Sequence, residues 1–376
     1  MQKIVVVGGG YAGMACLIEL AKKGRRHELH LVDAEPGHCK VTHLHKTFTT
    51  PVEGYTVPFA QLAEKFGFRF HHQRVSFAAD ELPRLENARA LPLPQGTLDF
   101  DQLVISTGAS AIPLRNGEKQ GFGLGDLRRG RGVEVFNRLL ERSEEEPAQI
   151  TLVGGGATGI QILFELKEQL RRKRIPHNLR LVDLNERLVP DQPEGFHRYI
   201  GKKLQREEIE YYPETRYLDH AEQAIRVEDL RAGRILSMNS HLTLLFPGVT
   251  PSPFALESNA YGQVLSGQTV LPSIFSAGDC AYFHSRGLNL LTAQAAVRKG
   301  RLVARNILNL AEGKNPYKYR YQEKGYLISL GSVDAIGWLG LRCNLVKGFA
   351  ASFIKDAMET QYDLFLDGVD TYLGFP

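Results

Sequence analysis

The chain has 376 residues, too many for one ordinary hydrophobic core, and its 43% hydrophobic and 23% charged residues are normal for a globular protein of two or three domains. Its net charge of +4 is too small to indicate a nucleic-acid partner. Four scattered cysteines exclude CxxC motifs and fit a cytoplasmic protein. No apolar run is long enough to span a membrane, and the N-terminus predicts a buried strand in place of a signal peptide.

A first nucleotide-binding module is predicted at the N-terminus. Residues 4–7 form a β-branched strand that runs into a GxGxxG loop, followed by a helix that ends at Gly24 and by a strand that ends at Asp33. The glycines allow a tight turn, a close approach to a pyrophosphate and helix packing, while the acid can bind a ribose. The predicted dinucleotide site comprises Gly8, Gly10, Tyr11, Ala12, Gly13 and Asp33.

A second module repeats the first. A polar connection at residues 143–147 leads into a strand at 149–153, a second GxGxxG loop, a helix from residue 160 to about 172 and a strand that ends at Asp183. This acid favours NAD(H) over NADP(H), although Arg187 nearby leaves the preference open. The predicted site comprises Gly154, Gly156, Gly159 and Asp183. Two such modules suggest a relay from nicotinamide through flavin to an acceptor.

Two further segments carry a resemblance to a known family. Residues 101–108 form a strand that ends in Thr107-Gly108, and residues 274–281 form a strand that ends in Gly278-Asp279. Together with the two glycine loops, in this order, they resemble the FAD motifs of the pyridine nucleotide-disulfide oxidoreductases. The resemblance implies that FAD occupies the first module and NAD(H) the second, and that Asp279 contacts the ribityl chain of the flavin.

Within that family the chain most resembles type II NADH dehydrogenases, the single-subunit NADH:quinone oxidoreductases. Residues 292–296 are similar to their quinone-pocket helix, and residues 323–332 to the strand pair that opens their C-terminal part. The resemblance implies an FAD-dependent NAD(P)H dehydrogenase that passes electrons from NADH through FAD to a quinone-type acceptor. Gln294 would then border the quinone.

Two positions depart from the type II pattern and are candidate catalytic-site residues together with Gln294. Gln161 stands where a glutamate is usual, and Glu165 lies one helical turn further on. Arg298 stands where a second glutamine is usual, and it would enlarge the positive field near the flavin. These departures bear on the acceptor more than on the fold.

Two alternative functions stay open. A flavoprotein that resembles sulfide:quinone reductases would need a redox-active pair drawn from Cys39, Cys280 and Cys343. A non-catalytic FAD-binding redox partner would need none. We predict no metal, because strand spacing alone can put His43 and His45 on one face.

The predicted fold class is α/β, with two Rossmann-like dinucleotide-binding domains and a short C-terminal cap or membrane anchor. We expect a discontinuous FAD domain at residues 1–112 and 251–325, an NAD domain at 113–250 and the cap at 326–376.

The cap is apolar over residues 335–341 and 345–354 and contains the only tryptophan, Trp338, with Arg342, Lys347 and Lys355 interspersed. We expect peripheral contact with the inner face of a membrane. The alternative is a surface that docks on the core or on a second copy of the chain, so a homodimer stays open.

Overall fold

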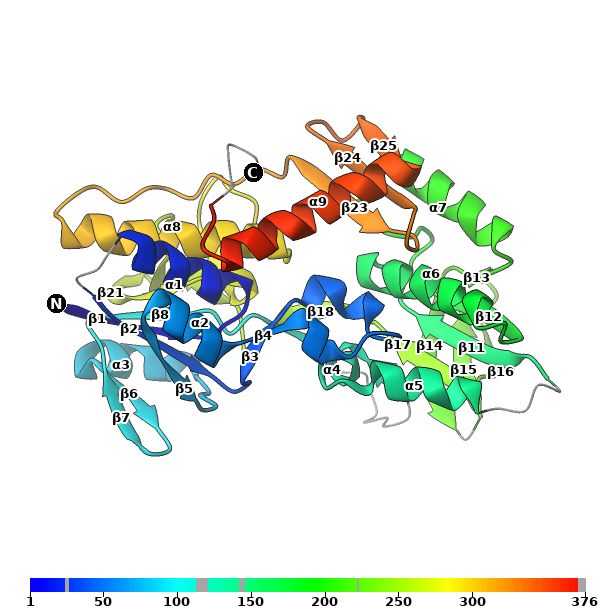
Figure 1. Cartoon of the computed structure of the whole chain (residues 1–376), viewed down its shortest axis with the longest axis horizontal. Coiled ribbons are helices and arrows are strands. Elements are labelled where there is room, and N and C mark those ends of the chain that lie inside the picture. Colours follow the sequence, from blue (N-terminus) through cyan, green and yellow to red (C-terminus); the bar gives the residue numbers. More distant parts are fainter. Residues whose placement is uncertain (24–26, 113–120, 142–145, 222, 371–376) are drawn as a thin grey trace.

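The computed structural model describes residues 1–23, 27–112, 121–141, 146–221 and 223–370. Two α/β lobes lie side by side, and the C-terminal helix crosses over both (Figure 1). The α/β fold class predicted from the sequence is therefore confirmed. Three expectations fall on undescribed residues: the helix end at Gly24, most of the connection at 143–147 and the start of the segment at 113–250.

The first lobe is built on an eight-stranded sheet that combines residues 2–105 with residues 256–283. Its order is β22-β19-β20-β21-β8-β1-β2-β5, and the five strands from β21 to β5 run parallel. The bounds are β1 Gln2–Val7, β2 His27–Asp33, β5 Phe68–His72, β8 Gln102–Ile105, β19 Leu256–Ser258, β20 Gln263–Ser266, β21 Thr269–Ser276 and β22 Ala281–Phe283.

Helices cover both faces of this sheet, which explains why strand β1 is continuously apolar. Ile4 and Val6 pack with α1 (Tyr11–Lys23) and α8 (Ala293–Ala311), whereas Val5 and Val7 pack with α3 (Leu82–Ala88) on the other face. Smaller elements complete the lobe: β3 Gly37–Cys39 paired with β4 Thr56–Pro58, β6 Ala90–Leu93 paired with β7 Gly96–Asp99, helix α2 Phe59–Phe66, and the short 3-10 helices η1 Val41–Lys46, η2 Val52–Tyr55, η3 Ala79–Glu81 and η4 Gly278–Cys280.

The second lobe contains a five-stranded parallel sheet in the order β10-β17-β11-β12-β13, with a three-stranded antiparallel sheet beside it. Its strands are β10 Phe122–Gly123, β11 Ala148–Val153, β12 His177–Val182, β13 Glu210–Tyr212, β14 Thr215–Ala221, β15 Ala224–Asp229, β16 Arg234–Asn239 and β17 Leu242–Leu245. Its helices are α4 Leu124–Arg128, α5 Arg131–Leu140, α6 Ala157–Arg172 and α7 Glu194–Arg206. A short antiparallel pair, β9 (Ala109–Ala111) with β18 (Val249–Pro251), lies where the chain passes between the lobes.

The C-terminal region forms three antiparallel strands, β23 Gly325–Ser329, β24 Ala335–Leu339 and β25 Leu345–Lys347, followed by α9 Gly348–Leu366. Trp338 is only 2% exposed, and its indole N–H donates to Gln192 at 3.0 Å. Lys355 is also buried, paired with Glu359. Both residues therefore pack inside the protein, and any membrane contact of this region would have to be made by its other side chains. Across the residues that the structure describes, no helix is both long and apolar enough to cross a membrane.

Helices α1 and α8 approach so closely that a glycine is required between them. A Cβ atom added at Gly300 would lie 2.1 Å from the backbone oxygen of Ala12. Because that oxygen belongs to the main chain of the first glycine loop, side-chain rotation cannot relieve the clash.

We expect Gly300→Ala to destabilise the protein by about 1–3 kcal/mol, because the two helices must separate. Gly201→Ala is the matched control, since Gly201 is also helical and an added Cβ would meet nothing within 4 Å. The control should be neutral or up to about 1 kcal/mol more stable. Denaturant unfolding of both variants measures the difference, and equal stabilities would contradict the argument.

Candidate functional site

The first glycine loop joins β1 to α1, and each of its three motif glycines has a different steric reason. Gly8 has a φ of 99°, and a Cβ there would lie 2.4 Å from the Ser106 carbonyl oxygen. A Cβ at Gly13 would lie 1.9 Å from the Gly8 carbonyl oxygen, whereas one at Gly10 would meet nothing within 4 Å. The outer glycines are thus needed for packing, and Gly10 leaves open space at the start of α1, where a phosphate can approach.

The second loop joins β11 to α6 and repeats this geometry. Gly154 has a φ of 108°, with the Phe246 carbonyl oxygen 2.1 Å from an added Cβ. A Cβ at Gly159 would lie 1.9 Å from the Gly154 oxygen, and the space around Gly156 is open. The internal repeat seen in the sequence is therefore also a repeat of backbone geometry.

The acid at the end of each second strand lies beside its own loop. Asp33 accepts the backbone N–H groups of Gly9 at 2.5 Å and Glu35 at 2.8 Å, and burial raises its pKa. Asp183 likewise accepts the N–H groups of Gly155 and Asn185. Arg187, which left the choice of nucleotide open, pairs with Glu194 at 3.0 Å on the exposed surface.

Asp279 has an unsatisfied oxygen, which is the clearest sign of a bound group. Its Oδ1 atom is buried and finds no hydrogen-bond partner among the described residues. Burial raises the pKa of this carboxyl to about 6, against the opposing effect of Lys299. A buried carboxylate oxygen without a protein donor is a suitable acceptor for a hydroxyl group of a ribityl chain. Nearby, Gly278 and Gly108 have positive φ angles of 81° and 82°, and Thr107 donates to the Ser252 carbonyl at 2.6 Å.

Lys299 was missed by sequence reasoning. It is 1% exposed, and its ammonium donates to the carbonyl oxygens of Gly278 and Ala281. Burial lowers its pKa to about 8, against the opposing effect of Asp279. In the sequence it stands beside another basic residue on an amphipathic helix, which indicates an exposed charge.

The three candidate catalytic-site residues occupy two places. Gln161, on α6, accepts from the Ser329 N–H at 3.3 Å and hydroxyl at 3.1 Å, so it ties α6 to β23. Gln294, in the first turn of α8, accepts from the Tyr321 hydroxyl at 3.0 Å. Arg298 acts electrostatically on Tyr321, whose pKa is raised above its usual value by burial. Glu165, one turn after Gln161, is buried with its pKa raised by burial, and it accepts from Gln169.

Two loop residues serve α1 packing as well as the candidate cofactor site. The Tyr11 ring lies 4.5 Å from that of Tyr362 on α9, and its hydroxyl is 2.8 Å from Thr42 Oγ1. The side chain of Tyr11 is therefore occupied by protein contacts, and its backbone is what can face a cofactor. Ala12 supports the contact with Gly300 described above.

No disulfide joins any of the four thiols. All four cysteines are free, and Cys343 is exposed. Cys280 is buried, which raises its pKa, and it donates to the Ile105 and Ala277 carbonyls. Cys280 packs in the hydrophobic cluster on the α3 side of the first sheet, whereas Cys39 packs against the core of the second lobe. Cys39 and Cys280 therefore lie in different hydrophobic clusters, and these two thiols do not offer the cysteine pair that a mechanism like that of sulfide:quinone reductases would need.

The histidines after Cys39 also have protein partners. His43 pairs with Glu359 at 3.0 Å, and His45 lies 3.4 Å from the Ser329 hydroxyl. Within the described part of the chain, no three His, Cys, Asp or Glu side chains are grouped so that they could hold a metal ion.

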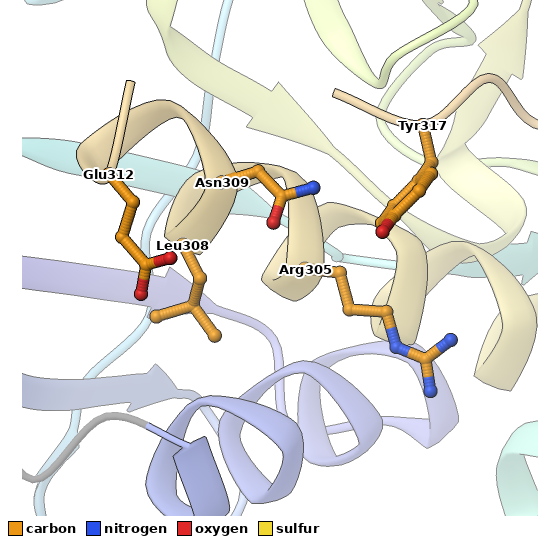
Figure 2. Close-up of a pocket in the computed structure, with 5 residues that line it drawn as sticks. All are labelled: Arg305, Leu308, Asn309, Glu312 and Tyr317. Atoms are coloured by element: carbon orange, nitrogen blue, oxygen red, sulfur yellow. The ribbon is translucent and has the colours of Figure 1, made fainter. Parts of the chain in front are cut away.

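A shallow hollow of about 280 Å³ lies elsewhere, on the C-terminal half of α8 and the segment after it (Figure 2). It is lined by Arg305, Leu308, Asn309, Glu312 and Tyr317. Arg305 is roughly 18 Å along the helix from its N-terminus, which faces the candidate site, and it pairs with Glu19. The hollow is therefore separate from the glycine loops.

Known proteins resemble this chain in sequence and in fold. Type II NADH:quinone oxidoreductases of Staphylococcus aureus and Staphylococcus saprophyticus are each 23% identical, over 98% of this chain and 96% of theirs. Among solved structures, the sulfide:quinone oxidoreductase of Aquifex aeolicus has a TM-score of 0.81 at 18% identity, covering 99% of this chain and 93% of that one. NDH2 of Plasmodium falciparum in complex with NADH has a TM-score of 0.80 at 14% identity, covering 100% and 99%.

The family model for pyridine nucleotide-disulphide oxidoreductases matches residues 2–300, which include both glycine loops, the Thr-Gly turn and the Gly-Asp turn. The chain therefore belongs to the pyridine nucleotide-disulphide oxidoreductase family.

Proposed function

We propose that the protein oxidises NADH with a bound FAD and passes the electrons to a quinone. The observation that carries the proposal is the duplicated loop geometry, with an acid beside each loop and a buried acceptor at Asp279 beyond the first. The names of the relatives support the same donor and acceptor.

In this proposal the two loops divide the cofactors between them. FAD would lie along Gly8, Gly10 and Gly13, with Asp33 at its adenosine ribose, Asp279 at its ribityl chain and Thr107, Gly108 and Gly278 around it. NADH would lie along Gly154, Gly156 and Gly159, with Asp183 at its ribose. Bound FAD supplies the hydride-accepting chemistry, and the chain supplies orientation and charge.

The acceptor would be bound near the start of α8. Gln294 and the Tyr321 hydroxyl are hydrogen-bonded there, and Arg298, one helical turn further along α8, adds positive charge. The amide of Gln294, whose oxygen accepts from the Tyr321 hydroxyl, offers N–H donors to a quinone carbonyl, and a cation beside it favours the anionic reduced form. Gln161 lies on α6 of the second lobe, and its influence on the reaction would pass through its hydrogen bond with Ser329.

We also propose peripheral membrane contact through the outer side of the C-terminal region. Phe349 and Phe353 lie four residues apart on α9 and are 72% and 66% exposed, and Leu341 is 68% exposed. Arg342 and Lys347 are exposed basic neighbours in the sequence. Exposed apolar side chains flanked by cations are typical of a surface that lies on anionic lipid.

Anaerobic mixing of the flavin-loaded protein with NADH is expected to bleach the flavin, and a water-soluble quinone should restore its colour. Asp183→Asn should weaken NADH binding about tenfold by removing a charged ribose acceptor, with FAD content unchanged. Glu186→Gln, an exposed carboxylate in the same loop, is the control. Bound flavin that NADH fails to bleach would refute the proposal.

In the FAD-free protein, the buried Asp279 carboxyl should make the free energy of unfolding depend on pH. Because the folded-state pKa of this carboxyl is raised to about 6, the stability it contributes at low pH is lost as the pH rises from about 4 to about 6. Asp279→Asn lacks that loss, so thermal unfolding should show the variant gaining on the wild type across this range. FAD binding by the variant should be weaker. Melting curves that stay parallel with pH would contradict the buried acceptor.

Membrane contact is tested by sedimentation with vesicles that contain phosphatidylglycerol. The double variant Phe349→Ser, Phe353→Ser should bind about tenfold or more weakly, because two large apolar side chains no longer enter the lipid. Ile235→Ser, at a residue 63% exposed on β16, is the matched control. Equal binding by all three proteins would remove this proposal and leave the redox proposal intact.

A further inference from the structure

Side chains form hydrogen bonds with both the N–H and the carbonyl group of Gly9. Its N–H donates to Asp33, and its carbonyl accepts from His38 Nδ1 at 2.9 Å. A Cβ at this position would lie 2.2 Å from the Phe59 ring, so that ring packs directly against the glycine. Since Gly10 follows directly, the orientation of the phosphate-facing backbone depends on these contacts.

The tautomer of His38 follows from its partners. The Gly9 carbonyl can only accept, so Nδ1 carries the proton. The ring is buried, and burial lowers its pKa to about 4, so it is neutral at pH 7. Its Nε2 atom must therefore accept, and the donor is the Tyr362 hydroxyl of α9 at 3.0 Å.

A second set of contacts joins the same helix to the same loop. The Tyr11 hydroxyl is 2.8 Å from Thr42 Oγ1, which is 3.2 Å from His43 Nδ1. His43 Nε2 is 3.0 Å from the carboxylate of Glu359 on α9. The Tyr11 ring also packs on Tyr362, so α9 contacts the loop through both hydrogen bonds and ring packing.

The second loop is held by contacts within its own lobe. The carbonyl of Gly155, the counterpart of Gly9, accepts from the backbone N–H of Val189 at 3.0 Å. Its Cα faces Leu188 of the same segment. The second loop is thus fixed within its own lobe, whereas the first is fixed by a side chain that α9 orients.

We propose that Tyr362 is a positioning residue for the FAD site, which acts through His38 and Gly9 and makes the C-terminal helix part of that site. The inference rests on the proposed use of the first loop for FAD. It implies that a change on α9, distant in sequence from every cofactor motif, loosens FAD and leaves NADH binding untouched.

The test measures FAD release from the flavin-loaded full-length protein by the fluorescence of free flavin after dilution. Tyr362→Phe leaves His38 Nε2 buried without a donor, so release should be about tenfold faster. The affinity for NADH, measured on flavin-loaded protein, should stay within about twofold. Tyr199→Phe removes a similar hydroxyl contact, to Asp334 at 2.9 Å, and should leave FAD release unchanged.

A second variant separates positioning from general stability. His38→Asn keeps a donor for the Gly9 carbonyl and removes the acceptor for Tyr362, so adding Tyr362→Phe to it should have no further effect on release. Additive effects, or equal release from the Tyr362→Phe and Tyr199→Phe proteins, would overturn the inference alone. A wild-type protein without flavin would overturn the proposed function as well.

Discussion

The whole arrangement depends on one steric constraint, the approach of a helix start to the strand end that precedes it. At Gly13 and at Gly159 an added Cβ would lie 1.9 Å from a carbonyl oxygen of the same loop. Only with hydrogen at these positions can α1 and α6 start where they do, with their N-terminal N–H groups toward the open space at Gly10 and Gly156. The strand order, the acids and the helix contacts are built around these two turns.

Local pattern was sufficient to predict the loops, because each motif glycine and each acid acts within a few residues of its own strand. The parallel sheets followed from the continuous apolar runs of strands such as β1. The roles of Lys299, His38 and Tyr362 could not be predicted, because their partners are distant in the chain and no short motif records them. Gln161 and Arg298 were found only as departures from a familiar pattern, and the pattern gave no partners for them.

In the C-terminal region, composition alone could not predict which side chains are exposed. Its apolar residues divide between two faces, and only the fold decides which residue lies on which face. Trp338 and Lys355 turn inward, while Phe349 and Phe353 remain outside. One helix therefore presents an apolar surface to the outside and polar contacts to the first glycine loop. The domain boundaries expected from the sequence stay predictions, although the chain passes between the lobes at β9 and β18.

The interleaved first sheet has a consequence for the order in which the chain folds during synthesis. Strand β8 pairs with β1 on one side and with β21 on the other, and β21 ends only at Ser276. The second sheet is complete once Leu245 has been made. We therefore expect the second sheet to form on the ribosome while β8 still has an unpaired edge, and in that interval the nascent chain is exposed to wrong strand pairing.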